Sequence, residues 1–432
     1  MRRMKSKSRY AAVLAGGLLC GLLAVAACSD PAEPMPDAAG VTVFEGARLL
    51  VGDGSEPIEN AAFIVQDDRF ALVGQVGELE VPAGAVHVNL TGKTVMPAIV
   101  DTHTHLSITR DALIEDLERR AYYGVAAAIS LGTDGGELSD QFRGATIPNA
   151  ARFLTAGRGI TAPEPGRSEV PHWVTTEAEA LTAVQDLAGR KVDLVKVWVD
   201  DRDGKYQKLT PALYGPIVDE AHTHGLRVTA HIFSLEDAKG LLQAGVDAFA
   251  HGIRDTDIDD EVVALFEAHP DLVLVPNLPG RGAVVDLSWL SGTIPAETLA
   301  TMQAASKDVP SAQEEFALQA RNLAKLSAAG VTVALGTDGN VPWSVHAEME
   351  DMVIAGLTPM QVIVAATRNG AELLGLFEIG TIAPGKSADF IVLDSNPLDD
   401  ITNTRDISSV YLRGEAVDRA AASARWAADG AE

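Results

Sequence analysis

The chain has 432 residues, more than one small domain needs, and 47% of them are hydrophobic, which indicates a globular protein with a large core. This composition excludes a mostly disordered chain, a collagen and a long coiled coil. Acidic residues outnumber basic ones by 60 to 34, giving a formal net charge of -26. Such an acidic surface argues against nucleic-acid binding and against electrostatic adhesion to anionic membranes.

The N-terminus has the pattern of a secretory signal. Basic residues within positions 2–9 precede an apolar run over 11–27 that is rich in Ala, Leu and Gly. This run is shorter than the ~20 residues that a membrane-spanning helix needs. It ends in Val-Ala-Ala-Cys-Ser, which resembles the lipoprotein box of bacteria and implies cleavage before Cys28 and lipidation of that residue. An ordinary cleaved signal is the alternative.

We therefore expect residues 1–27 to be a lipoprotein signal peptide and residues 28–40 to be a flexible tether. Ser29 after the cysteine resembles the sorting pattern for the outer membrane. The mature protein is predicted to be exported and lipid-anchored, in the periplasm or at the cell surface. The sequence does not indicate which membrane face it occupies.

The ends of the mature chain are predicted to form a small β layer. Residues 41–97 alternate apolar and polar positions between turns rich in Gly and Asp, which is typical of short strands. Residues 379–418 return to this pattern and are expected to complete a β-sandwich. The Ala-rich segment 419–432 is expected to be a loose tail.

Between these segments, residues 98–378 contain eight apolar strand candidates separated by helical stretches, several of which stop at a Gly. Eight β-α units over about 280 residues match a barrel better than an open doubly wound sheet. The predicted fold class is α/β, a (β/α)8 TIM barrel that carries a small β-sandwich formed by the terminal segments.

Polar residues at the C-terminal ends of the barrel strands are the candidates for a site, because TIM barrels build their active sites there. Five such residues are His103, His105, His231, His251 and Asp338. The first two are two residues apart on one strand and therefore face the same way. Each residue alone could be a core histidine or a turn former. Together, imidazole and carboxylate favour zinc or another first-row divalent metal.

Lys196 is the second unusual feature, because it lies inside the apolar strand segment DLVKVWV, where an ammonium group is costly. A buried lysine of this kind needs a lowered pKa or an anionic partner. His222 and His224 repeat the His-x-His spacing near the end of a predicted helix, where such positions diverge, so we expect them on a helix surface. His87 and His269 indicate no site.

Arg254 is a candidate partner for a substrate carboxylate, because a guanidinium binds that group through two parallel hydrogen bonds. The alternative is a surface ion pair with Asp255 or Asp257. Further candidates for substrate contact, all in predicted loops, are His172, Tyr206, Asn277, Trp343 and His346.

In this order, the segments MPAIVDTHTHL, VKVWV, TAHIF, AFAHG and LGTDG resemble the motifs of the metal-dependent amidohydrolase superfamily. The similarity is nearest to its imidazolonepropionase-like and Xaa-Pro or Xaa-Arg dipeptidase-like members. It extends over nearly the whole mature chain, including GTIAPGKSADFIVLD, which is similar to the closing β segment of that superfamily. MPAIVD stands where the family pattern has MPGLID, a departure that leaves the ligand positions intact.

Carried over by position, the resemblance implies His103, His105 and Asp338 as ligands of one metal ion. It implies His231 and His251 as ligands of a second ion. Lys196 would be N-carboxylated (N6-carboxylysine) and would bridge two divalent ions, which are expected to be zinc. A mononuclear site, as in imidazolonepropionase-type and deaminase-type members, is the alternative.

These residues predict a hydrolase of carbon–nitrogen bonds in small substrates such as N-acyl amino acids, dipeptides or cyclic amides. A hydroxide between two metal ions is a nucleophile at neutral pH, and Asp338 would act as general base and then as general acid. The same site could hydrolyse lactones or phosphoesters. A non-catalytic lipoprotein that binds peptides or metal is a third hypothesis. The oligomeric state is left open, a homo-oligomer included.

Overall fold

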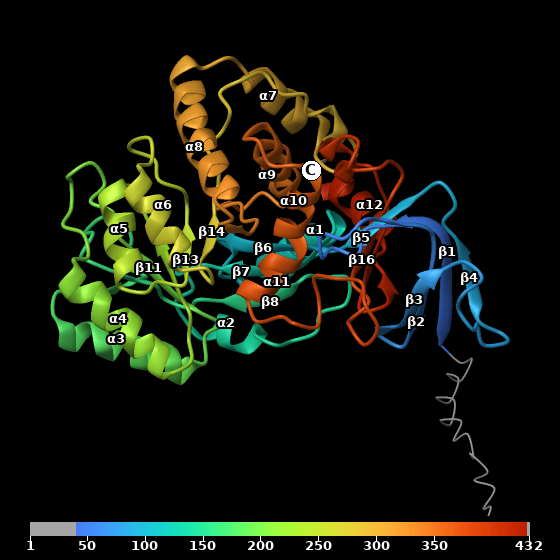
Figure 1. The fold of residues 1–432 in the computed structure, drawn as a ribbon, viewed down its shortest axis with the longest axis horizontal. Helices are drawn as coiled ribbons and strands as arrows, with labels where there is room; N and C mark the ends of the chain where they lie inside the picture. Colours follow the sequence, from blue (N-terminus) through green and yellow to red (C-terminus); the bar gives the residue numbers. More distant parts are fainter. Residues whose placement is uncertain (1–39, 430–432) are drawn as a thin grey trace, which may run out of the picture. The chain divides into compact units, whose positions relative to one another are not determined.

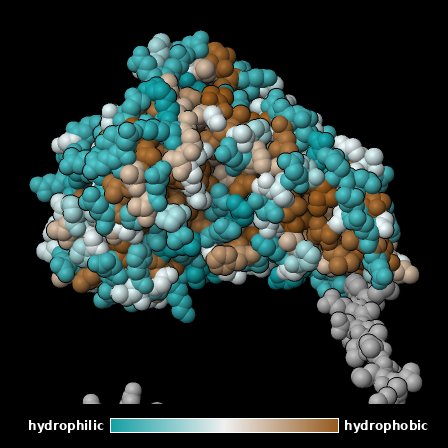
Figure 2. All heavy atoms as spheres, viewed as in Figure 1, coloured by the Kyte–Doolittle hydropathy of each residue, from teal (hydrophilic) through white to brown (hydrophobic). Residues whose placement is uncertain are grey.

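The computed structural model describes residues 40–429 (Figure 1). The predicted signal peptide, Cys28 and all but the last residue of the predicted tether lie outside these residues. Within the described part of the chain, no helix combines the length and the apolar character that crossing a membrane requires. Hydrophilic side chains gather over the helices α3 to α6 on the face seen in Figure 2.

Eight parallel strands form the barrel, as predicted. They are β6 (Ile99–Thr104), β7 (Val125–Ser130), β8 (Arg152–Thr155), β11 (Val195–Trp198), β12 (Val228–His231), β13 (Ala248–Ala250), β14 (Val273–Val275) and β15 (Thr332–Val333). Short strands β9 (Ile160–Thr161) and β10 (His172–Trp173) lie beside β11. Most positions of these strands are apolar because both faces of each strand are buried.

Backbone hydrogen bonds join the two sheets of the barrel at both of their edges. Asp193 N donates to Thr155 O (2.9 Å) between β8 and β11, and Thr102 N donates to Leu335 O (3.0 Å) between β6 and the segment after β15. The strand order around the barrel is therefore β6, β7, β8, β11, β12, β13, β14 and β15. Strand β12 is consequently on the opposite side of the barrel from β6.

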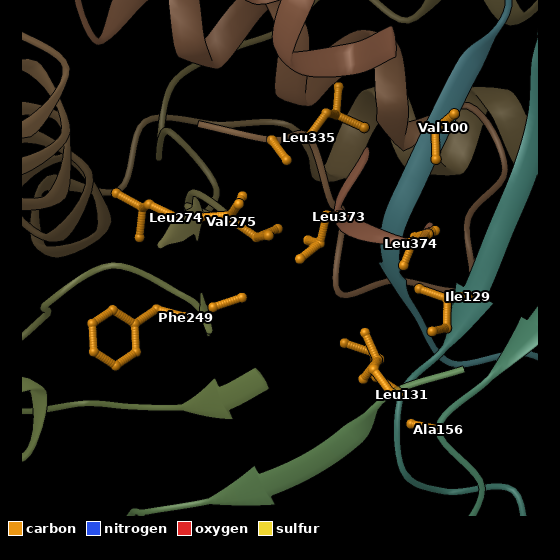
Figure 3. Packing of buried hydrophobic residues seen from close by; sticks show 14 of the residues in the cluster. Val100, Ile129, Leu131, Ala156, Phe249, Leu274, Val275, Leu335, Leu373 and Leu374 are labelled. Carbon is orange, nitrogen blue, oxygen red and sulfur yellow. The ribbon is translucent and has the colours of Figure 1, made fainter. Parts of the chain in front are cut away.

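The helices follow the strands in alternation. They are α1 (Arg110–Tyr122), α2 (Glu137–Phe142), α3 (Glu177–Arg190), α4 (Pro211–Thr223), α5 (Leu235–Gln243), α6 (Asp260–Glu267), α7 (Ala296–Ala305), α8 (Pro310–Ala328), α9 (Ser344–Ile354), α10 (Pro359–Val364) and α11 (Gly370–Leu373). In α3, Thr176 and Glu179 form a capping box that satisfies the first backbone N–H groups. Buried side chains from β6, β7, β13 and β14 belong to one core cluster with those of the helices (Figure 3).

The two terminal segments form one sandwich-like sheet. Its strands are β1 (Val41–Leu49), β2 (Ile58–Gln66), β3 (Arg69–Gln75), β4 (Val86–Asn89), β5 (Thr94–Pro97), β16 (Phe390–Leu393), β17 (Ile407–Leu412) and β18 (Glu415–Ala416). The C-terminal strand β16 pairs antiparallel with β5. Five aromatic rings fill the core of this layer, and Phe390 contacts four of them, namely Phe44, Phe63, Phe70 and Tyr411.

The prediction of a loose tail over residues 419–432 was wrong for its first part. Arg419–Asp429 form helix α12. Alanine has the highest helix propensity, and one aromatic side chain gives this helix a buried contact, since Trp426 is only 2% exposed. Its ring packs edge-on against Tyr122 of α1 at 5.3 Å, and the Arg119 guanidinium lies over it at 4.3 Å.

Phe390→Ala should lower the free energy of unfolding by about 3–5 kcal/mol, because it leaves a cavity among four rings that join the two ends of the chain. Guanidinium denaturation followed by circular dichroism measures this change. Leu72→Ala on β3, where the side chain is 37% exposed, is the control and should cost about 0.5 kcal/mol or less. Equal effects of the two substitutions on stability would contradict the conclusion that the aromatic core holds the two terminal segments together.

Candidate metal centre

Three of the predicted ligands converge at the C-terminal ends of neighbouring strands. His103 is the second-last residue of β6, His105 lies just beyond that strand, and Asp338 follows β15. Asp338 Oδ1 lies 3.1 Å from His103 Nε2 and 3.1 Å from His105 Nε2. One ligand atom from each residue lies within 4.8 Å of the other two. Two imidazole nitrogens and a carboxylate oxygen are a donor set that suits a divalent ion such as zinc.

The backbone around these residues is strained. His251, Asn277 and Asp338 all have positive φ values, of 92°, 45° and 50°. Non-glycine residues adopt this conformation at a cost of about 1–3 kcal/mol each, and such residues cluster at functional sites. Gly336 allows the close approach of the segment after β15 to β6, because a Cβ there would lie 2.8 Å from His103 Cβ.

A buried ion pair fixes Asp338 relative to β6. Asp101, which is fully buried, accepts hydrogen bonds from Arg120 Nη1 (3.0 Å) and from Thr337 Oγ1 (2.9 Å). Arg120 Nη2 in turn donates to Gly339 O (3.0 Å). The residues on both sides of Asp338 are therefore tied to the strand that carries His103. Sequence reasoning missed this role, although Asp101 stands in the same motif.

Burial sets the protonation state of the first histidine. Desolvation, helped by the positive charge of Lys196, lowers the pKa of His103 to about 4, so that its ring is neutral near pH 7. Its Nδ1 lies 2.8 Å from Asn277 Oδ1, and with a metal ion bound a neutral ring would donate from Nδ1 to this oxygen and offer the lone pair of Nε2 to the ion. Burial alone would raise the pKa of Asp338, but hydrogen bonds from His103 and His105 hold it below its usual value.

Lys196, His231 and His251 lie next to this cluster. The His251 ring lies 5.2 Å from that of His103 and 4.6 Å from that of His231, and its Nε2 is 3.5 Å from Asp338 Oδ2. Lys196 Nζ and His251 Nε2 are buried and have no hydrogen-bond partner within the described residues. Burial lowers the pKa of Lys196 to about 7, although Asp338 opposes the shift. A second metal with a carboxylated lysine fits these unpaired groups.

His231 has different surroundings, because three charged side chains lie around its Nε2, and a metal ion bound at this nitrogen would replace those contacts. Asp200 Oδ2 lies 2.9 Å from this nitrogen, Arg202 Nη1 lies 3.1 Å away and Arg254 Nη2 lies 3.2 Å away. Sequence reasoning named Arg254 but missed Asp200 and Arg202. Asp200 carried a signal, since it lies four residues after Lys196 and thus on the same face of an extended segment.

His346 does not join the site, which corrects one of the predictions, while the contact of His172 with substrate stays a prediction. His346 lies in α9, not in a loop, and it is fully buried between Tyr123 O (3.1 Å from Nε2) and Thr404 Oγ1 (3.0 Å from Nδ1). The reason is that α9 begins six residues after Asp338 and turns this side chain into the packing. His172 lies on β10, and its Nε2 is 3.3 Å from Asp186 Oδ2 on α3.

The remaining predicted residues occupy these places. Tyr206 lies in the loop after β11 and donates to Pro165 O (3.2 Å), and its contact with substrate stays a prediction. Trp343 precedes α9 and packs at 6.1 Å from Tyr123. His222 and His224 lie at the surface end of α4, as expected, 2.9 Å and 3.3 Å from carboxylates of neighbouring residues.

Known proteins resemble this chain over most of its length. A family model described as the amidohydrolase family matches residues 94–417. An imidazolonepropionase of Deinococcus deserti is 29% identical over 376 residues, which cover 82% of this chain and 90% of that protein. The structure of a proposed prolidase from Bifidobacterium longum is 26% identical, with a TM-score of 0.73 and coverage of 92% and 100%. That of an Xaa-Pro dipeptidase with bound methionine is similar in fold, at 20% identity, a TM-score of 0.70 and coverage of 87% and 99%.

Asn277→Ala should weaken zinc binding about 10–100-fold, because it removes the acceptor that fixes the His103 ring and its tautomer. Competition with a chromophoric chelator measures the affinity, and circular dichroism checks the fold. Gln185→Ala removes an exposed amide from α3 and should leave zinc affinity unchanged. Unaltered zinc affinity in Asn277→Ala would show that His103 needs no such support.

His346 should make stability depend on pH. Burial, with the nearby charge of Arg405, lowers its pKa from 6.5 to about 3, so the unfolded chain takes up a proton that the folded protein does not. Its contribution is present above pH 6.5 and is lost as pH falls towards 3. Below pH 6.5 the stability advantage of the wild type over His346→Gln should shrink by about 1.4 kcal/mol per pH unit in urea titrations. If the free energies of unfolding of the wild type and His346→Gln changed with pH in parallel, this role of His346 would be refuted.

Proposed function

Because the chain belongs to the amidohydrolase family and is a hydrolase acting on carbon–nitrogen bonds, we propose that it cleaves small amides at the metal centre of His103, His105 and Asp338. N-acyl amino acids, dipeptides and cyclic amides are the proposed substrates. The observation that carries the proposal is the meeting of two imidazole nitrogens with an ionised carboxylate at the open end of the barrel. The names of the relatives, an imidazolonepropionase and a prolidase, support it.

The proposal includes two divalent ions, expected to be zinc. His103, His105 and Asp338 would hold the first ion, while His231, His251 and a carboxylated Lys196 would hold the second. Such ions supply a water that is deprotonated near neutral pH and polarise the carbonyl under attack. The low pKa of Lys196 supports its carboxylation, because the free amine is the form that combines with carbon dioxide.

Asp338 is the proposed acid and base. Its side chain is 38% exposed, whereas those of His103 and His251 are almost fully buried, so Asp338 can reach a bound substrate. With its carboxylate ionised, Oδ2 can accept a proton from the attacking water and then donate it to the leaving nitrogen. The two buried imidazoles stay neutral during these transfers. We also propose export and lipid anchoring at Cys28, on the sequence pattern given above.

Hydrolysis of a substrate panel by the zinc-loaded mature protein tests this function. Amine should be released from N-acyl amino acids, dipeptides or cyclic amides, and Asp338→Asn should lower kcat about 10²–10⁴-fold because proton transfer is lost. His224→Ala is the matched control, since it removes a histidine from the α4 surface, and it should keep metal content and activity.

Two outcomes would contradict the proposal. Cleavage of lactones or phosphoesters without any amide hydrolysis would assign the site to the other chemistry. Retention of peptide without release of amine, in protein of full metal content, would indicate a binding lipoprotein.

A further inference from the structure

We infer that Arg254, with Arg202 beside it, binds a carboxylate on the leaving-group half of the substrate. The substrate is then an N-acyl amino acid or a dipeptide with a free C-terminus, and not a neutral amide. This inference rests on the proposed function for its scissile bond. It goes beyond that function because it assigns the substrate class and adds Arg202 to the residues that select it.

Arg254 carries a largely buried charge that no carboxylate of the described residues contacts directly, although the charges of Asp200 and Asp338 lie near it. Among residues 40–429, no carboxylate oxygen lies within 4.0 Å of its guanidinium nitrogens, and its Nε is buried without a hydrogen-bond partner. Its acidic neighbours in the sequence are engaged elsewhere. Asp255 accepts from Leu235 N (3.0 Å), and Asp257 pairs with Arg321 (3.0 Å). A buried cation without an anion is costly, which favours a site made for one.

The position of this guanidinium is fixed before any substrate arrives. Arg254 Nη2 donates to Ile232 O (2.7 Å), and the backbone N of Arg254 donates to Phe233 O (2.9 Å). The guanidinium carbon lies 5.4 Å from the centre of the Phe233 ring, a cation–π contact. Because the side chain of Arg254 is already held in place, it loses little conformational entropy when an anion binds.

Arg202 brings a second guanidinium to the same place. Its Nη1 bonds Asp200 Oδ2 (2.5 Å) and its Nε bonds Glu164 Oε1 (3.1 Å), while Nη2 is buried without a partner. Arg202 and Arg254 both reach His231 Nε2, at 3.1 Å and 3.2 Å, so their ends face one space. Asp200 and Glu164 both contact Arg202, whereas no carboxylate in the described chain lies within 4.0 Å of the Arg254 guanidinium nitrogens, so Arg254 is the member of the pair without a direct anionic partner.

The place of the pair relative to Asp338 indicates an α-amino acid. The His231 and His251 rings are 4.6 Å apart, and His251 Nε2 is 3.5 Å from Asp338 Oδ2, so one imidazole separates the arginines from the acid–base group. In an N-acyl amino acid, one carbon atom separates the amide nitrogen from the carboxylate. A planar guanidinium matches a carboxylate through two parallel hydrogen bonds. The arginines hence lie on the side of the leaving nitrogen.

Matched ligands that differ only in this charge test the inference. N-acetyl-L-leucine and N-acetyl-L-leucinol, with the glycine and phenylalanine pairs, are titrated by calorimetry into zinc-loaded Asp338→Asn protein, which limits turnover. The acids should bind at least about 10-fold more tightly than the alcohols, as expected for charge-assisted hydrogen bonds. Arg254→Met should abolish this preference, Arg254→Lys should retain part of it, and Arg202→Met should reduce it.

Arg321→Met is the matched control, because it removes the same charge from the exposed face of α8, and it should keep the preference for acids. Equal binding of acids and alcohols, binding of neither, or a preference that survives Arg254→Met would overturn the inference. Circular dichroism and zinc content of each variant exclude a loss of fold or metal as the cause.

Hydrolysis of the same pairs by the wild type separates this inference from the proposed function. Equal kcat/KM for acids and alcohols would leave the hydrolase in place and refute the carboxylate site. Preferential binding of acids without release of leucine or any other amine would support the carboxylate site and refute the hydrolase.

Discussion

The hydrogen-bond network of Asp101 is the constraint on which the proposed metal centre depends. A barrel must join its first and last strands, and here the join also carries the chemistry, because β6 holds His103 and the segment after β15 holds Asp338. Asp101 binds Thr337 and Arg120, and Arg120 binds Gly339 O. A pair buried this deeply gains little net stability over apolar residues. Its effect is to fix the position of β6 relative to the segment after β15, because a small shift between them would separate His103 from Asp338.

The low-dielectric interior of the barrel also sets the protonation states of the side chains near the contact between β6 and the segment after β15. Burial keeps His103 neutral and lowers the pKa of Lys196 to about 7, whereas hydrogen bonds from two imidazoles keep Asp338 ionised. A cation-binding site needs neutral nitrogens and an ionised carboxylate together, and these are the states that this arrangement favours at neutral pH. Lys196 Nζ and His251 Nε2 have no hydrogen-bond partner among the described residues, and a bridging anion and a metal would satisfy both.

Sequence reasoning could find the barrel and the cluster of His103, His105 and Asp338, because a parallel barrel is built from mostly apolar strands and polar residues gather near their C-terminal ends. The sequence could not decide whether Arg254 contacts a substrate or forms an ion pair with Asp255 or Asp257, which are close to it in sequence. Only the fold shows that these two carboxylates bind the backbone N–H of Leu235 and the side chain of Arg321 instead. His346 was misplaced because the start of α9 left no apolar signal of its own. Asp200 and Arg202 were missed since loops are rich in charged residues, and proximity to His231 alone distinguishes these two.

The strand order places the two arginines and Asp338 on different sides of the C-terminal end of the barrel. The proposed acid–base residue Asp338 follows β15, which lies beside β6, while the arginines approach β12, across the barrel. Asp338 is held in a strained backbone conformation by the Asp101 network, which is internal to the barrel. Arg202 instead lies in a loop after β11, also at positive φ (57°), and is held by Asp200 and Glu164. If the two proposals hold, changes in that loop can alter which amide binds without moving Asp338 and the histidines near it.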